Sequence, residues 1–192
     1  TTPAGKSATV TGGTYGWSID EDTELVNLQN SILNGEVVTR EPAYYAGGTA
    51  AAHSGQDWGN TYAEVDMSAQ HMWYVQNGQV VLETDVVTGE PIPSKITPEG
   101  VYSLMWKQPN SVLVGEIDPD TGEPAYRTKV KCWMQVTSSG VGFHDATWQT
   151  AFGGTLYQIP GTGSHGCINM PLDQAAALFN MIEPGTPVIF HW

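Results

Sequence analysis

Alternation of apolar and polar residues is the pattern that most constrains this chain, from Thr61 to its C-terminal end. The runs 71–75 and 80–87 flank Asn77-Gly78, a dipeptide that favours the type I′ turn of a two-residue β-hairpin. Further alternating or apolar runs cover 62–66, 101–106, 129–136 and 187–192, and a single good helical pattern covers 175–182. Several short strands separated by turn residues predict a mainly β domain, a sandwich or a barrel.

Composition agrees with a turn-rich β protein, because the 192 residues include 22 Gly and 12 Pro. Acidic residues outnumber basic ones by 20 to 7, which leaves a net charge of −13. This charge argues against nucleic acid as a partner, since a phosphate-binding surface needs Lys and Arg, and it disfavours docking on anionic lipid. The two cysteines exclude a disulfide-dense scaffold and a four-thiolate zinc site, and no window is apolar enough for a membrane span.

The first 60 residues differ from the rest and are expected to form a separate small α+β segment with a linker, before a domain over 61–192. Ser18 and Glu21 have the spacing of a capping box, and apolar residues at helical spacing predict a helix over 19–33 that stops at Asn34-Gly35. A strand is predicted over 36–45 and a linker over 46–60. The chain begins without Met or a leader, and we expect it to be a segment of a longer protein.

The two cysteines lie in different surroundings. Cys132 falls inside an alternating strand, where a cysteine is usually a small buried apolar residue. Cys167 follows Gly-Ser-His-Gly, a run suited to a tight turn whose amides could face a developing oxyanion. A cysteine nucleophile needs a base, and both His144 and His165 are available. Asp145, through its side chain or its carbonyl, could fix the tautomer of His144.

The run Ser-His-Gly-Cys-Ile-Asn (164–169), with His144 upstream and Trp148 four residues after it, resembles the active-site signature of L,D-transpeptidases of the YkuD family. The resemblance covers about 61–192, through 68–73, Thr-Pro-Glu-Gly at 97–100 and 185–188. The 19 residues between His144 and Ser164 exceed the family's usual spacing, and the extra length is expected at 160–163. Residues 15–42 resemble the end of the peptidoglycan-binding domain that precedes the catalytic domain in Gram-positive members.

This resemblance implies a β-sandwich of mixed sheets with one or two short helices, and a role for each residue of the signature. Cys167 is the nucleophile, and His144 is the base that activates it and later the acid for the leaving amine. Asp145 orients His144, through its carbonyl rather than its carboxylate. The amides of Gly166 and Cys167, supported by His165, form the oxyanion hole.

Four further residues are assigned to substrate binding, each against a structural alternative. Ser164 and Asn169 either contact substrate or only hold the turn by hydrogen bonds, and Trp148 either walls the acyl-donor site or packs in the core. The loop 110–127 is expected to cover the cleft as a flap. Tyr126 on that flap, and Trp106, are candidate substrate contacts.

The activity implied is acyl transfer on peptidoglycan stem peptides, with release of D-alanine, a thioester on Cys167 and a 3→3 cross-link. Water in place of the acceptor amine would make the same site an L,D-carboxypeptidase. Carbapenems are implied as covalent inhibitors, with no cofactor and no metal. The implied location is the wall or surface of a Gram-positive bacterium, with any membrane anchor outside these residues.

Other interpretations explain less of the pattern. A zinc site could use His144, His165 and Cys167, and a binding module could hold peptidoglycan without reacting. A papain-type peptidase has its Cys before its His along the chain, the reverse of the order here. The acidic turn 118–123 lacks the ligand spacing of a calcium loop and is expected to be solvated.

Overall fold

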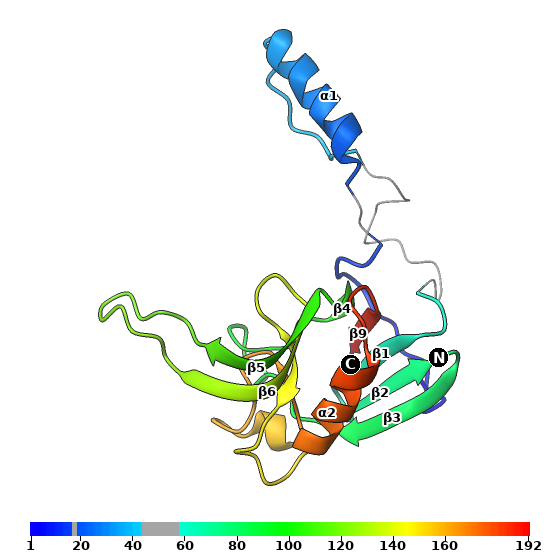
Figure 1. Ribbon diagram of the computed structural model, residues 1–192, viewed down its shortest axis with the longest axis vertical. Coiled ribbons are helices and arrows are strands. Elements are labelled where there is room, and N and C mark those ends of the chain that lie inside the picture. Colours follow the sequence, from blue (N-terminus) through cyan, green and yellow to red (C-terminus); the bar gives the residue numbers. More distant parts are fainter. Residues whose placement is uncertain (17–18, 44–57) are drawn as a thin grey trace.

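Two β-sheets packed face to face form the body of the computed structural model, which describes residues 1–16, 19–43 and 58–192 (Figure 1). The first sheet has the order β3-β2-β1-β9-β4 and the second the order β5-β6-β7-β8. Each sheet is mixed, because β1 and β9 run parallel in the first and β7 and β8 run parallel in the second. The mainly β sandwich expected from the sequence is confirmed.

The elements of the two sheets interleave along the chain. The first sheet consists of β1 (Tyr62–Asp66), β2 (His71–Gln76), β3 (Gln79–Asp85), β4 (Gly100–Ser103) and β9 (Pro187–His191). The second consists of β5 (Trp106–Val114), β6 (Arg127–Gln135), β7 (Gly142–Asp145) and β8 (Ile168–Met170). The described helices are α1 (Glu21–Leu33), the 3₁₀ turn η1 (Leu156–Gln158) and α2 (Leu172–Met181).

The core lies between the two sheets and is closed on one side by α2. Val65 and Phe190 of the first sheet are fully buried together with Phe143 and Ile168 of the second, and Leu178 of α2 joins the same cluster. This core fixes β7 and β8 from behind, so that their other face is left for the polar residues of the site. The helix begins three residues earlier than the predicted 175 and ends at Met181.

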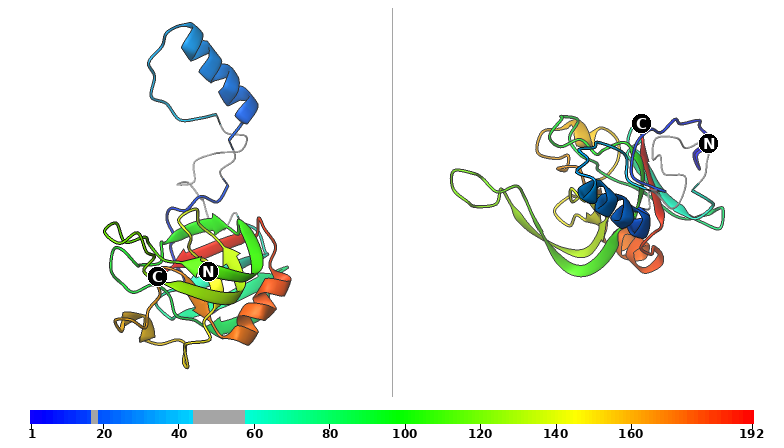
Figure 2. Two further views of the ribbon diagram at one scale, coloured as in Figure 1. Left: turned by 60° about the vertical axis from the view of Figure 1, so that its left-hand side comes forward. Right: turned by 90° about the horizontal axis from the view of Figure 1, so that it is seen from above.

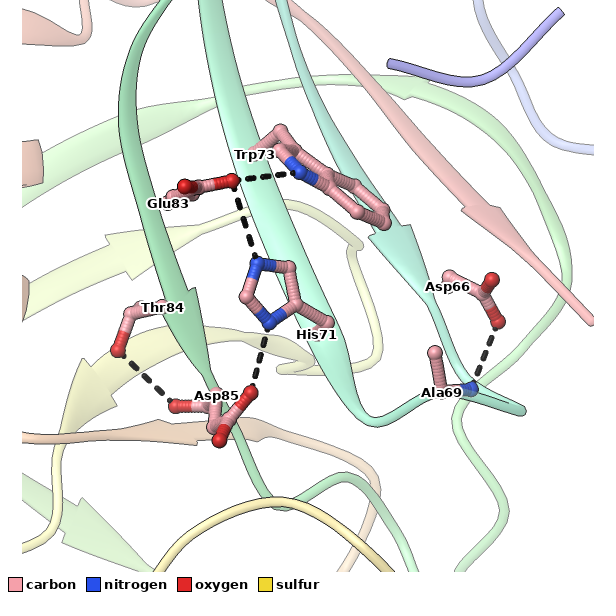
Figure 3. A network of polar contacts seen from close by, with 7 residues as sticks. All are labelled: Asp66, Ala69, His71, Trp73, Glu83, Thr84 and Asp85. Carbon is pink, nitrogen blue, oxygen red and sulfur yellow. Dashed lines mark hydrogen bonds and ion pairs between the residues drawn. The ribbon is translucent and has the colours of Figure 1, made fainter. Parts of the chain in front are cut away.

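The predicted hairpin of β2 and β3 is present, and both Asn77 and Gly78 have positive φ angles, 52° and 78°, as a type I′ turn requires. A polar network spans the two strands at the far end of this hairpin (Figure 3). His71 Nδ1 lies 2.7 Å from Asp85 Oδ1, and Trp73 Nε1 donates to Glu83 Oε2 at 3.1 Å. These contacts tie the edge strand β3 to β2 through side chains as well as backbone.

The predicted strand over 101–106 is confirmed for 101–103, which belong to β4, but β4 ends at Ser103 and β5 begins at Trp106. Between them, Leu104 N–H donates to Thr186 O, just before β9 of the first sheet, and Met105 N–H donates to Gln135 O of β6 in the second. The chain therefore crosses from one sheet to the other here.

The N-terminal residues pack on the outer edge of the first sheet. Gly13 forms a parallel bridge with Val101, and Thr14 N–H donates to Val101 O at 2.9 Å. A Cβ on Gly13 would lie 1.9 Å from the Val101 carbonyl oxygen, so this approach requires glycine. Part of the predicted 1–60 segment therefore covers the edge strand β4 of the sandwich.

Helix α1 forms by local signals and stands apart from the sheets in Figure 1 and in the left-hand view of Figure 2. Its N-cap is Asp20, whose Oδ1 accepts from Thr23 N–H at 2.9 Å, which corrects the predicted capping box of Glu21 with Ser18, a residue outside the described part. Gly35, with φ of 64°, confirms the predicted stop. No residue of α1 is buried.

The predicted strand over 36–45 is wrong for 36–43, which form no strand, and its last two residues lie outside the described part. A β-strand needs a neighbouring ladder for its N–H and C=O groups. Among the described residues, 36–43 take part in no ladder, although Asp20 N–H donates to Ala43 O at 2.8 Å. The predicted linker over 46–60 also lies outside the described residues, except for its last three.

Candidate active site

The parallel pairing of β7 and β8 brings the predicted nucleophile and base to one face of the second sheet. Phe143 pairs with Ile168, and His144 pairs with Asn169. Cys167 is the residue immediately before β8, next to the strand that carries His144. Phe143 and Ile168 point into the core, which directs His144 and Asn169 to the opposite face. The alternation of the two strands thus sets the catalytic geometry.

A pocket of about 580 Å³ opens on this face, within the size range of small-molecule sites. Both Cys167 and His144 line it, with the flap on one side and the loop before β8 on the other. The remaining lining residues are Leu113, Tyr126, Thr128, Trp148, Gln149, Thr150, Ala151, Leu156, Gly161, Thr162, Gly163, Ser164, His165 and Asn169.

His144 is held in the tautomer that a general base requires. Its Nδ1 lies 3.0 Å from the carbonyl oxygen of Asp145, and because a carbonyl only accepts, Nδ1 carries the proton and Nε2 is left with a free lone pair. Burial lowers the pKa of His144, against the opposing effect of Asp145, so the ring is neutral at neutral pH.

The carboxylate of Asp145 bonds to the backbone of β6 and not to the imidazole. Its Oδ1 accepts from the N–H groups of Lys131 and Cys132 at 2.7 and 2.8 Å. Of the two routes by which Asp145 could fix the tautomer, the geometry therefore uses the carbonyl. The carboxylate locks β7 to β6 and so fixes the backbone that carries His144.

The two cysteines differ as the sequence suggested. Cys132 is buried in the core, where burial raises the pKa of its thiol. Cys167 lines the pocket, and burial of its thiol raises its pKa to about 11. Its Sγ lies 3.5 Å from the carbonyl oxygen of Gly140. At neutral pH the resting nucleophile is therefore a thiol, and its proton has to be removed during the attack.

The turn before Cys167 is closed by Ser164. Its Oγ donates to Cys167 O at 2.5 Å and accepts from Gly166 N–H at 3.0 Å. The N–H of Gly166 is thus already used, which corrects its expected place in an oxyanion hole. Among the described residues, the N–H groups of Cys167 and His165 have no hydrogen-bond partner and remain available.

Aromatic side chains form the open wall of the pocket. Trp148 is 51% exposed, so it is not part of the core, and its ring centroid lies 5.8 Å from that of His144. Tyr126 of the flap packs against the His165 ring at 5.1 Å. Trp106 does not line the pocket; its ring contacts Trp133 at 6.4 Å, so the expectation of a substrate contact is wrong for this residue.

Asn169 is bonded to the segment that follows β7. Its Nδ2 donates to Gln149 Oε1 at 2.6 Å, and among the described residues its buried Oδ1 has no hydrogen-bond partner. The contact with Gln149 is the structural alternative for Asn169, and its contact with substrate stays a prediction.

Within the described part of the chain, no group of three or more His, Cys, Asp or Glu side chains is placed to hold a metal ion. His144, His165 and Cys167, the three candidates of the zinc interpretation, accordingly do not form such a group. In the acidic turn, Asp118 Oδ1 accepts from the N–H groups of Asp120 and Thr121, at 2.8 and 3.2 Å. None of the described helices has the length and apolar character needed to cross a bilayer.

The model of the L,D-transpeptidase catalytic domain, YkuD, matches residues 60–190. The chain belongs to this family. A solved Enterococcus faecium L,D-transpeptidase shares 42% sequence identity, with a TM-score of 0.70 over 99% of this chain and 71% of that chain. The catalytic domain of the E. faecium enzyme acylated by ertapenem shares 45% identity, with a TM-score of 0.58 over 68% of this chain and 96% of that chain.

The curated L,D-transpeptidase 1 of Mycobacterium tuberculosis is 30% identical over 124 residues, which are 64% of this chain and 47% of that protein. The chain thus spans about half the length of the curated relatives it matches. Family membership and fold agree with the resemblance carried by residues 164–169. The residue roles rest on the geometry of this chain's own pocket.

Reasoning from the sequence missed a second segment that builds the YkuD site. Residues 87–97 pass behind the loop 161–169: Ser164 N–H donates to Thr88 O at 3.0 Å, and Gly161 N–H donates to Glu90 Oε1 at 2.9 Å. Glu90 also pairs with Lys95 at 3.0 Å, and its pKa is lowered by the Gly161 N–H and by Lys95. The signal that the sequence offered was Gly89 with Pro91 and Pro93, turn residues in a stretch without a helical or alternating pattern.

Proposed function

We propose that this chain is the catalytic part of a cysteine-dependent L,D-transpeptidase that acts on peptidoglycan stem peptides. One observation carries the proposal: Cys167 and His144 line one pocket, with His144 Nδ1 bound to the Asp145 carbonyl. That arrangement leaves Nε2 unprotonated on a ring that lines the same pocket as the thiol, as base catalysis requires.

The acylation step follows from these groups. Cys167 Sγ attacks the carbonyl carbon of the L,D peptide bond while its proton passes to His144 Nε2. The developing oxyanion is stabilised by the free N–H groups of Cys167 and His165. The imidazolium then protonates the amine of D-alanine, the C–N bond breaks, and a thioester remains on Cys167.

The second step transfers the acyl group to an amine. The nitrogen of the acceptor amine attacks the thioester carbonyl while His144, neutral again, removes a proton from that amine. His144 then passes the proton to the leaving Cys167 sulfur. The product is a 3→3 cross-link. If water is the acceptor, the same steps release a shortened stem and the activity is that of an L,D-carboxypeptidase.

A carbapenem ring offers the same nucleophile a strained acyl bond. The E. faecium catalytic domain acylated by ertapenem supports the proposal that Cys167 is a target of this class of inhibitor. A substrate in the wall places the protein outside the cytoplasm, and we infer a location at the wall or surface of a Gram-positive cell. The proposed partners are donor and acceptor stems.

The test is intact mass after mixing the protein with a disaccharide-tetrapeptide. Wild type and Cys132→Ala should show a transient adduct equal to the stem less D-alanine, and Cys167→Ala should show none. Cys132→Ala is the matched control because it removes the other thiol of the chain. No adduct and no released D-alanine with either lysine or diaminopimelate stems would overturn the proposal in favour of a non-reacting binding module.

A further inference from the structure

Thr97 lies behind the nucleophile turn and is 2% exposed. Its Oγ1 accepts from Gly89 N–H at 3.0 Å and lies 2.8 Å from the carbonyl oxygen of Gly166. Because the Gly89 N–H can only donate, the Thr97 hydroxyl keeps its proton for the Gly166 carbonyl. The directions of both hydrogen bonds are therefore determined by chemistry.

The carbonyl of Gly166 and the N–H of Cys167 belong to one planar peptide group and point in opposite directions. A hydrogen bond that holds the carbonyl therefore also aims the N–H. Gly166 has a φ of 112°, a region where a backbone without Cβ can rotate readily, so the peptide needs an external restraint. Thr97 supplies that restraint from the side opposite the pocket.

A second effect acts through polarisation. The N–H of Gly89, the hydroxyl of Thr97 and the peptide group of Gly166 and Cys167 form one chain of hydrogen bonds that ends at the Cys167 N–H. Hydrogen bonds in such a chain strengthen one another in a buried environment. The Cys167 N–H thereby becomes a better donor to a negative oxygen.

The packing around this chain leaves no room for another arrangement. A Cβ on Gly89 would lie 1.9 Å from Lys95 O and 3.0 Å from Gly166 Cα, so the backbone of 87–97 is in direct contact with the turn. On the other side of the same turn, the Gly166 N–H is held by Ser164 Oγ. The two peptide groups that flank Gly166 are thus held by two different hydroxyls.

We propose that Thr97 is a positioning residue for acyl transfer, which aims and polarises the Cys167 N–H of the oxyanion hole through the Gly166 carbonyl. The inference rests on the proposed function, since it assigns Thr97 a task in that reaction. It predicts an effect on the chemical step and none on the binding of the acyl donor.

The experiment compares Thr97→Val, Thr97→Ser and a control, Thr2→Val. Thr2 is buried, its hydroxyl accepts from Lys6 N–H at 3.1 Å, and it does not line the pocket. Thr97→Val leaves the Gly89 N–H and the Gly166 carbonyl without partners, and Thr2→Val leaves the Lys6 N–H without one, so both variants lose stability but only Thr97→Val releases the turn.

Acylation by a carbapenem is followed at increasing concentration. Thr97→Val should lower the limiting rate of acylation by about 10- to 100-fold, less than the 10²–10³ that follows removal of a whole oxyanion-hole donor, with unchanged half-saturation. Thr97→Ser should restore the rate, and Thr2→Val should keep it. Equal losses of the limiting acylation rate in the two valine variants would overturn the inference. So would a change in the half-saturating carbapenem concentration alone.

A second readout does not depend on activity. The chain holds two cysteines, so ¹⁵N-cysteine labelling yields two backbone amide signals, assigned through Cys132→Ala. Thr97→Val should move the Cys167 signal and leave that of Cys132, and Thr2→Val should leave both. A Cys167 signal that stays in place in Thr97→Val would refute the positioning role, even for a protein that forms no thioester.

Discussion

Two walls of the same pocket are built in opposite ways. The nucleophile loop, residues 161–169, is bonded to the segment behind it, and Gly163, Ser164 and Gly166 in it are buried. The flap, residues 110–127, extends from the sandwich as a hairpin whose two strands pair with each other, and most of its side chains are exposed (Figure 2). Cys167, the proposed nucleophile, sits on the wall that is bonded to the segment behind it, and the flap has few tertiary contacts.

The difference predicts that the same substitution slows acylation in the nucleophile loop and leaves its rate unchanged in the flap. A Cβ on Gly163 would lie 2.5 Å from Tyr157 O and 2.6 Å from Glu90 Cγ, whereas a Cβ on Gly122, in the flap turn, would meet nothing within 4 Å. We expect Gly163→Ala to abolish most acylation and to cost about 1–3 kcal/mol of stability. Gly122, with φ of 73°, should lose only about 1–2 kcal/mol on change to Ala and keep its acylation rate.

Thermal unfolding and the acylation rate of the two alanine variants measure this prediction. The comparison fails if Gly122→Ala slows acylation as much as Gly163→Ala, because the flap would then be as tightly coupled to the chemistry as the loop.

The pH dependence of acylation should be set by His144 and Cys167 and not by the flap. Burial lowers the pKa of His144, so the imidazole stays neutral at pH values where an ordinary histidine is protonated. The acylation rate should therefore fall as the pH is lowered, with a midpoint under about 6.5. The loss appears as pH falls because a protonated imidazole cannot accept the thiol proton. With the pKa of Cys167 raised to about 11, no second inflection from the thiol is expected near neutrality.

Acylation rates between pH 4.5 and 8.5 provide the test, with Tyr126→Phe as the flap variant that should leave the midpoint in place. A midpoint above 7 would contradict a desolvated imidazole. A midpoint that moved with Tyr126→Phe would show that the flap sets the ionisation of the base.

Removing the flap's aromatic contact should have the smallest effect. Tyr126→Ala loses the ring packed at 5.1 Å on His165, a contact of about 0.5–1.5 kcal/mol, so we expect a two- to twelvefold weaker half-saturation for the acyl donor. Tyr126→Phe keeps the ring and should bind as wild type does. Saturation kinetics distinguish weaker half-saturation from a fall in the limiting rate. A fall in the limiting rate would instead show that Tyr126 contributes to the chemical step.

Local rules were enough for elements whose partners are neighbours in the chain. Asn77-Gly78 predicts its own turn because the φ angles it needs are available to those two residues. Gly35 ends α1 for the same reason. The strand predicted over 36–45 did not form in its described part, 36–43, because a strand, unlike a turn, needs a partner that no local pattern supplies.

Helices α1 and α2 also show that a local pattern does not reveal the tertiary partner of an element. Both were predicted from periodicity, and both formed, but α2 buries Ala175 and Leu178 whereas α1 buries none of its residues. Periodicity indicates that a helix has an apolar face. It does not indicate what covers that face.

The sequence by itself determined the reacting groups: the order of His144 and Cys167, the tight turn between Ser164 and Cys167, and the family to which they belong. The tertiary structure alone decided how those groups are held. Ser164 occupies the Gly166 amide, the carbonyl of Asp145 selects the tautomer of His144, and Thr97, 69 residues before Gly166, holds its carbonyl. Turn chemistry acts over a few residues and can be read locally, whereas hydrogen bonds between distant segments exist only once the core has brought those segments together.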